Sequence, residues 1–143
     1  MNKFRLLRLF VLFIILNSVC YGSEIEHIRI ELNPENENQQ IKVIYDSSVN
    51  NNAYPFNVFA SCLEGWGRKG GLKKANIMKI PKTIQPEGSY IIYAKIKKTN
   101  LIKKYRLMNF YVMQDINTGI YYETDLLQYL YGYLSQEYIK MLD

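Results

Sequence analysis

Apolar and polar residues alternate near the start of the chain's main body. Positions 28, 30 and 32 are apolar, and positions 27, 29 and 31 between them are polar. A period of two predicts a strand with one buried face and one solvated face. A turn-forming run follows at residues 33–36, and the alternation returns over residues 41–45. We therefore expect residues 27–46 to form a first hairpin.

The next segment predicts a third strand and a loop. Residues 56, 58, 60 and 62 share one face of this expected strand, which places Cys62 in the core. Pro55 suits the first position of a strand, where its missing N–H is tolerated. Residues 65–71 contain four glycines and predict a loop, after which residues 72–80 have the pattern of an extended segment.

The strongest strand pattern lies in the middle of the chain. Residues 89–98 and 101–114 are rich in tyrosine, isoleucine, phenylalanine and valine, and Thr99 and Asn100 between them predict a two-residue turn. A second turn at residues 117–119 precedes a short strand at 120–122. A two-residue turn would pair Lys95 with Lys104, Tyr93 with Arg106, and Lys97 with Ile102 on one side of the ribbon.

The hydrophobic period changes after residue 124. From position 126 to position 142, leucine, tyrosine and methionine recur at helical spacing. Thr124 suits the N-cap, and Asp125 is favourable at the positive end of the helix dipole. We therefore expect an amphipathic helix over residues 124–142, although Gly132 costs about 1 kcal/mol relative to alanine.

These elements together predict a mainly β chain of the α+β class. Six to seven short strands would form an antiparallel β-sandwich or curved sheet, and the C-terminal amphipathic helix would pack across one face or end of it. No internal repeat or linker divides residues 23–143, so we expect them to form a single domain.

The first 22 residues have the pattern of a cleaved signal peptide. Three basic residues within the first eight precede an uninterrupted apolar run at residues 9–16. This run is shorter than the roughly 20 residues that a membrane-spanning helix needs. Small residues at positions 20 and 22 predict cleavage after Gly22, so we expect the remaining chain to be periplasmic or secreted.

Cys20 raises the alternative of a lipoprotein, because a lipidated cysteine follows this kind of apolar run. Lipoprotein signals prefer a small residue just before the cysteine, and Val19 does not fit that preference. If Cys20 is removed with the signal peptide, Cys62 is the only thiol left and no disulfide forms within the chain.

Charge is distributed unevenly along the expected domain. Residues 23–64 hold seven acidic and two basic residues, and residues 107–143 hold five acidic and one basic. The segment between them, residues 65–106, holds one acidic and twelve basic residues. A cationic middle between acidic flanks predicts a surface that attracts an anionic partner or the chain's own acidic segments.

The glycine loop contains the spacing Gly65-x-Gly67-x-x-Gly70, which also occurs in dinucleotide-binding proteins. That fingerprint requires a preceding strand, a helix that begins at the last glycine and an acidic residue about 20 positions on. The extended pattern after residue 71 does not provide the helix, so we interpret residues 65–71 as a surface loop. Its aromatic and basic side chains make it a candidate recognition tip; with the lysines that follow, these are Trp66, Arg68, Lys69, Lys73 and Lys74.

The basic hairpin is the second candidate binding surface. Like charges directly opposite each other destabilise a sheet, so an anionic partner, an acidic segment of the same chain or solvation must offset the repulsion. The candidate residues are Tyr93, Lys95, Lys97, Lys104 and Arg106. An acidic protein is the partner that we expect; anionic lipid or lipopolysaccharide is an alternative, and export does not favour a nucleic acid.

Catalytic chemistry can be tested by elimination. A single histidine, His27, remains in the expected domain, whereas a zinc site needs three or four ligands. His27 and Cys62 face opposite ways in the predicted strands, which does not favour a Cys–His pair. Asp115, Glu123 and Asp125 lie near turns and form no evident carboxylate pair. We expect no metal or other cofactor, and an exported protein that is not an enzyme; a small secreted hydrolase is the weaker alternative.

Export, small size, concentrated charge and the lack of a catalytic set favour a protein-binding role. The most concrete hypothesis is an inhibitor or immunity-type protein of the bacterial envelope that neutralises a periplasmic effector or hydrolase. The alternative is a structural subunit or accessory protein of an envelope, secretion or pilus assembly. Exposed tyrosines on the C-terminal helix would suit either role, because exposed aromatic patches mark partner sites.

Overall fold

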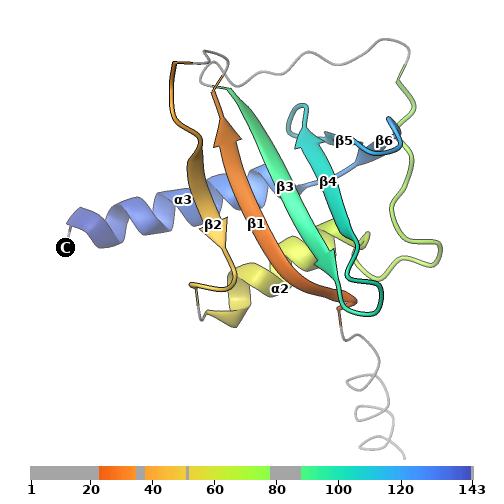
Figure 1. Ribbon diagram of the computed structural model, residues 1–143, viewed down its shortest axis with the longest axis horizontal. Helices are drawn as coiled ribbons and strands as arrows, with labels where there is room; N and C mark the ends of the chain where they lie inside the picture. Colours follow the sequence, from red (N-terminus) through yellow and green to blue (C-terminus); the bar gives the residue numbers. More distant parts are fainter. Residues whose placement is uncertain (1–22, 35–37, 51, 78–87, 143) are drawn as a thin grey trace, which may run out of the picture.

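The computed structural model describes residues 23–34, 38–50, 52–77 and 88–142 (Figure 1). The predicted signal peptide, its cleavage site and Cys20 therefore lie outside the described residues. In the part of the chain that is described, no helix is long and apolar enough to cross a membrane.

Six antiparallel strands form one sheet in the order β2-β1-β3-β4-β5-β6. The predicted fold class is confirmed: the chain is mainly β, of the α+β class, with a C-terminal helix. The described strands make one open sheet and not the two sheets of a sandwich. The strands are β1 (Ile25–Asn33), β2 (Lys42–Asp46), β3 (Ser89–Ile96), β4 (Ile102–Leu107), β5 (Val112–Asp115) and β6 (Tyr121–Glu123).

Two helices, α2 (Ala53–Leu63) and α3 (Leu126–Leu142), cover the same face of the sheet (Figure 1). The core lies between them and the sheet, where alternate residues of β1 and β3 such as Ile28, Ile30 and Ile92 are fully buried. The N-cap predicted for the C-terminal helix is present, because the Thr124 hydroxyl accepts a hydrogen bond from the backbone N–H of Leu126 at 3.1 Å. The first predicted hairpin is also present, since β1 and β2 pair antiparallel.

The prediction of a third strand over residues 56–62 is wrong, because these residues belong to helix α2. Asn52 caps the helix by accepting a hydrogen bond from the N–H of Tyr54, and Pro55 lies in the first turn, where a missing N–H costs nothing. The buried residues include adjacent pairs, which lie on one face of a helix but on opposite faces of a strand: Pro55, Phe59, Ala60, Cys62 and Leu63. The burial of Cys62 was predicted correctly although its element was not.

The predicted register of the basic hairpin is also wrong. Lys95 pairs with Ile102, Tyr93 with Lys104, and Ile91 with Arg106. The connection is longer than two residues because the N–H of Ile96 donates to the carbonyl of Leu101, and Asn100 adopts a positive φ of 52°. The shift is two residues, so the side chains keep the predicted face but change their opposite partners. The expected opposition of Lys95 and Lys104 does not occur.

The predicted strand over residues 101–114 is divided into β4 and β5 by a turn at residues 108–111. The predicted extended segment at residues 72–80 is described only as far as residue 77. Its described part lies beside β6, where Lys74 forms a bridge with Tyr122 and the N–H of Ala75 donates to the carbonyl of Tyr121 at 3.0 Å. This contact covers the β6 edge of the sheet.

Gly88 sets the entry into β3, and Gly88→Ala is expected to destabilise the fold by about 1 to 3 kcal/mol. Its φ is +138°, and an added Cβ would lie 2.0 Å from the backbone oxygen of Asn33 on the neighbouring strand. Urea unfolding of both proteins measures the loss. Gly119→Ala is the matched control, because a Cβ there meets no atom within 4 Å although its φ is also positive; equal losses in the two variants would contradict the steric argument.

Candidate protein-binding face

The side of the sheet opposite the described helices is named here the open face. The strand pairing shows which side chains of neighbouring strands lie next to one another on this face. Its central residues are His27, Arg29, Glu31, Asp46, Ile91, Tyr93, Lys95, Ile102, Lys104 and Arg106. Most of these side chains are charged or aromatic, whereas most side chains on the other side are apolar and belong to the core.

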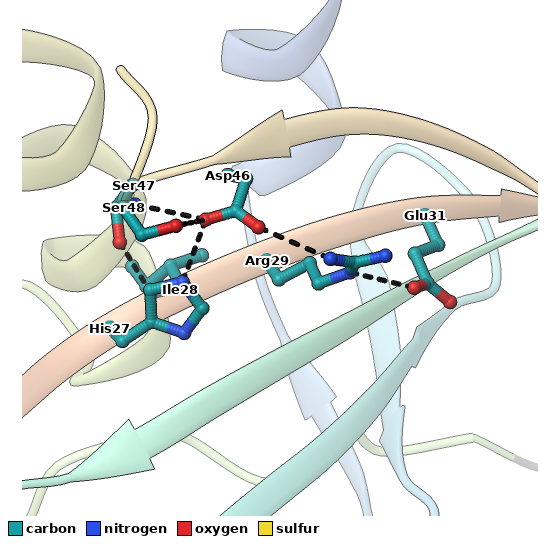
Figure 2. Close-up of polar contacts among 7 residues, drawn as sticks. All are labelled: His27, Ile28, Arg29, Glu31, Asp46, Ser47 and Ser48. Carbon is teal, nitrogen blue, oxygen red and sulfur yellow. Dashed lines mark hydrogen bonds and ion pairs between the residues drawn. The ribbon is translucent and has the colours of Figure 1, made fainter. Parts of the chain in front are cut away.

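Asp46 is the centre of a hydrogen-bond network at one end of the open face (Figure 2). Its Oδ1 accepts hydrogen bonds from the backbone N–H and hydroxyl of Ser48 at 2.9 and 2.6 Å, and lies 2.8 Å from the His27 Nε2. Burial opposes the charged carboxylate, but the hydrogen bonds from Ser48 and His27 outweigh it and hold the pKa of Asp46 well below its ordinary value. The carboxylate is therefore a fixed negative charge.

Arg29 links this carboxylate to Glu31 (Figure 2). Its Nη1 lies 3.2 Å from Asp46 Oδ2, and its Nε donates to Glu31 Oε1 at 2.8 Å. Burial and the charge of Glu31, which accepts a hydrogen bond from the Tyr93 hydroxyl, raise the pKa of Tyr93. Lys104 completes the series, with its Nζ 5.5 Å from the centre of the Tyr93 ring. The network thus crosses β2, β1, β3 and β4.

Both acids in this network are engaged by Arg29, which leaves Lys104 and Arg106 without an acidic partner among the described residues. Within the described residues, neither Lys104 nor Arg106 forms an ion pair. The Arg106 Nε is buried and has no hydrogen-bond partner there, and such a group is uncommon in folded proteins. Lys95 contacts Glu26 at 3.5 Å in an exposed pair, which is weak. The open face therefore has surplus positive charge.

The structure separates the predicted binding residues into two groups. Tyr93, Lys95, Lys104 and Arg106 lie together on the open face, and Lys97 is exposed at its end, in the turn after β3. The second group lies in and after the glycine loop: Trp66, Arg68, Lys69, Lys73 and Lys74. Lys73 is paired with Glu123 at 3.1 Å, and the other lysines and Arg68 are exposed.

The glycine loop follows helix α2 and not a strand, and the described residues directly after it, 72–77, form no helix. The strand before the loop and the helix directly after it, which dinucleotide binding requires, are therefore missing from the described residues; the sequence interpretation expected only the missing helix. Trp66 adopts a positive φ of 56° and packs on Tyr129 of α3 with the ring centres 5.5 Å apart. At 43% exposure, its indole is half packed and half available to a ligand.

His27 and Cys62, the candidates for a catalytic Cys–His pair, do not contact each other. His27 faces the open side of the sheet, whereas Cys62 is buried in the core on the helix side. Burial raises the pKa of the Cys62 thiol to about 12, so the thiol stays protonated and unreactive at neutral pH. In the described ranges, no group of three or more His, Cys, Asp and Glu side chains could hold a metal ion.

Sequence reasoning missed the residues that organise the open face, namely Arg29, Glu31 and Asp46. The alternation around residue 29 did place them on the polar side of a strand, and Asp46 followed by two serines is a signal for an Asx turn. Their mutual contacts depend on the β1–β2 register, which has a bulge between Ile30 and Glu31.

Comparisons of the chain with protein-family models, curated proteins and solved structures found no match.

Proposed function

We propose that this chain is an exported, non-enzymatic protein-binding domain of the bacterial envelope, and that the open face captures an acidic partner protein. An inhibitor or immunity-type protein for a periplasmic effector or hydrolase is the form that fits best. The proposal rests on two cations of the open face, Lys104 and Arg106, which have no acidic partner among the described residues. The acids of the neighbouring network, Glu31 and Asp46, are already paired with Arg29. The basic and apolar residues at positions 3–16 support export.

The rigidity of the open face favours binding through it. Arg29 is held by two carboxylates, and Lys104 Nζ lies 5.5 Å from the centre of the Tyr93 ring. Side chains that are already ordered lose less conformational entropy when a partner binds. Surplus positive charge on this face also accelerates encounter with an acidic protein.

The second candidate, a subunit of an envelope assembly, is favoured by a different surface. The end of α3 extends beyond β2 (Figure 1), and Tyr138 and Met141 there are 64% and 83% exposed. Ile41 and Val43, at the β2 edge of the sheet, are also exposed. A strand edge that pairs with no other described strand, beside exposed apolar side chains, suits a permanent neighbour more than a transient one.

The experiment that tests the first proposal is capture of partners from envelope and culture-supernatant extracts at low and high salt, with mass spectrometry and then measurement of association rates. Lys104→Glu/Arg106→Glu should slow association with the captured protein at least about tenfold at low salt. Lys42→Glu/Lys140→Glu changes the net charge equally away from the open face and should have little effect. Equal rates in the two double variants would exclude the open face, and recovery of several envelope proteins together would favour the assembly role.

A further inference from the structure

A cleft of about 1030 Å³ lies on the helix side of the sheet, on the side opposite the open face. Its walls are α2, the glycine loop and the helix-facing side of β3 and β4. The space exists because small side chains face it from both layers: Ala60 on α2 and Ala94 on β3 line the cleft and are each 1% exposed. Larger residues at these two positions would fill it.

The inner walls of the cleft combine apolar and polar surface in comparable amounts. Leu63, Leu72 and Ile96 contribute aliphatic surface, and Tyr105 and Tyr122 contribute rings. Burial raises the pKa of Tyr105 far above its ordinary value, so its phenol is uncharged at physiological pH. The cleft is comparable in size to ligand pockets, which typically measure about 300–1,000 Å³ and combine apolar walls with a few polar groups.

Two of the acids that line the cleft already have partners. Glu64 Oε1 accepts hydrogen bonds from the Ser23 hydroxyl and from the backbone N–H groups of Glu24 and Ile25, at 2.9, 2.8 and 3.3 Å. Asp115 Oδ1 accepts from the N–H groups of Asn117 and Thr118. The charges of these two carboxylates are therefore stabilised by their own backbone surroundings.

Two cations that line the cleft have no such partner. Arg68 of the glycine loop and Lys103 of β4 are exposed, and within the described ranges neither forms an ion pair. Glu24 is the remaining acid of the cleft and is exposed to solvent. The cleft therefore has aliphatic and tyrosine walls and two cations that form no ion pair within the described residues, which complements a ligand that has an apolar body and an anionic head.

From this arrangement we infer that the cleft binds a single-chain amphiphilic carboxylate, such as a fatty acid. The alkyl chain lies against the aliphatic and tyrosine walls, and the carboxylate is held by Arg68 and Lys103. Each buried methylene raises affinity about fourfold, so the apolar walls select a long chain over a small anion. An arginine suits the head group because its fork of donors matches a carboxylate.

Trp66 provides the test, because it lines the cleft and is the only tryptophan in the chain. Laurate, added to the purified protein below its critical micelle concentration, should change the intrinsic fluorescence saturably with one site per chain. Dodecanol has the chain without the charge, and acetate the charge without the chain; both should bind at least about tenfold more weakly. A failure of laurate to bind, confirmed by calorimetry, or equal binding of acetate would overturn the inference.

Arg68→Glu/Lys103→Glu should weaken laurate binding about tenfold or more, while Lys42→Glu/Lys140→Glu should leave it unchanged. Both variants change exposed side chains, and circular dichroism confirms that they are folded. Undiminished laurate binding by Arg68→Glu/Lys103→Glu would contradict the role of the cleft. The open-face variant Lys104→Glu/Arg106→Glu should bind laurate normally, so this inference can fail or hold independently of the proposed protein partner.

Discussion

Phe59→Ala is expected to lower the free energy of unfolding by about 3 to 5 kcal/mol, because it removes the centre of the contact between α2, α3 and the sheet. Phe59 is 1% exposed, and its ring centre lies 5.1 Å from that of Tyr45 on β2 and 6.0 Å from that of Tyr133 on α3. The ring centres of Tyr45 and Tyr133 are 5.6 Å apart. The three rings join three elements, so the cavity left by alanine cannot close without moving one of them. Urea unfolding at neutral pH measures the loss.

Tyr45→Phe is the matched control for this cluster. The Tyr45 hydroxyl is buried and has no hydrogen-bond partner among the described residues, so its removal should be neutral or stabilising. The ring contacts with Phe59 and Tyr133 remain in this variant. If Tyr45→Phe lowers the free energy of unfolding by more than about 1 kcal/mol, the hydroxyl has a partner. If Phe59→Ala lowers it by less than about 2 kcal/mol, the three-ring contact is not central to the fold.

Asp46→Asn is expected to cost about 2 to 4 kcal/mol at neutral pH, because it removes the charge that Arg29, His27 and Ser48 stabilise. The pKa of Asp46 is lower in the folded chain than its ordinary value of 3.8. The stabilisation is therefore complete above the unfolded pKa and is lost as the pH falls below about 4 towards the folded pKa. The stability difference between the wild type and Asp46→Asn should shrink over that acidic range.

Denaturant unfolding of both proteins at pH 7, 4 and 3 measures this dependence. Glu137→Gln is the matched control, because it removes a carboxylate whose only described partner, Lys140, is exposed on the surface of α3. An exposed pair of this kind contributes less than about 1 kcal/mol. A difference between the wild type and Asp46→Asn that stays constant from pH 7 to pH 3 would show that the charge of Asp46 is not what stabilises the fold.

The local pattern of apolar and polar residues was sufficient to predict most of the sheet. The alternation over residues 27–32 placed Ile28 and Ile30 in the core and His27, Arg29 and Glu31 on the other side, and strand β1 has this arrangement. The C-terminal helix followed from leucines at helical spacing, with Thr124 as its cap. In these segments the buried face has a single period, so the sequence admits one interpretation.

The candidate open face was only partly predictable for a geometric reason. Tyr93, Lys95, Lys104 and Arg106 were assigned to one side of a hairpin, and the side was correct. Their partners were wrong because the turn at residues 97–100 is longer than two residues, and a two-residue register shift preserves the face while changing every opposite pair. Sequence alone therefore predicted like charges opposite each other where the structure has Lys104 beside Tyr93.

The sequence by itself determined the strand and helix periods, the polar side of β1 and the concentration of cations between residues 65 and 106. Tertiary structure decided that residues 53–63 form a helix, because their apolar spacing fits either period and only the core between sheet and α3 selects one. Tertiary structure also decided which charges neutralise each other. Asp46, Arg29 and Glu31 are brought together by the β1–β2 register, whereas Lys104 and Arg106 form no ion pair among the described residues. Periodicity does not predict this difference, because an ion pair depends on a distance that periodicity does not specify.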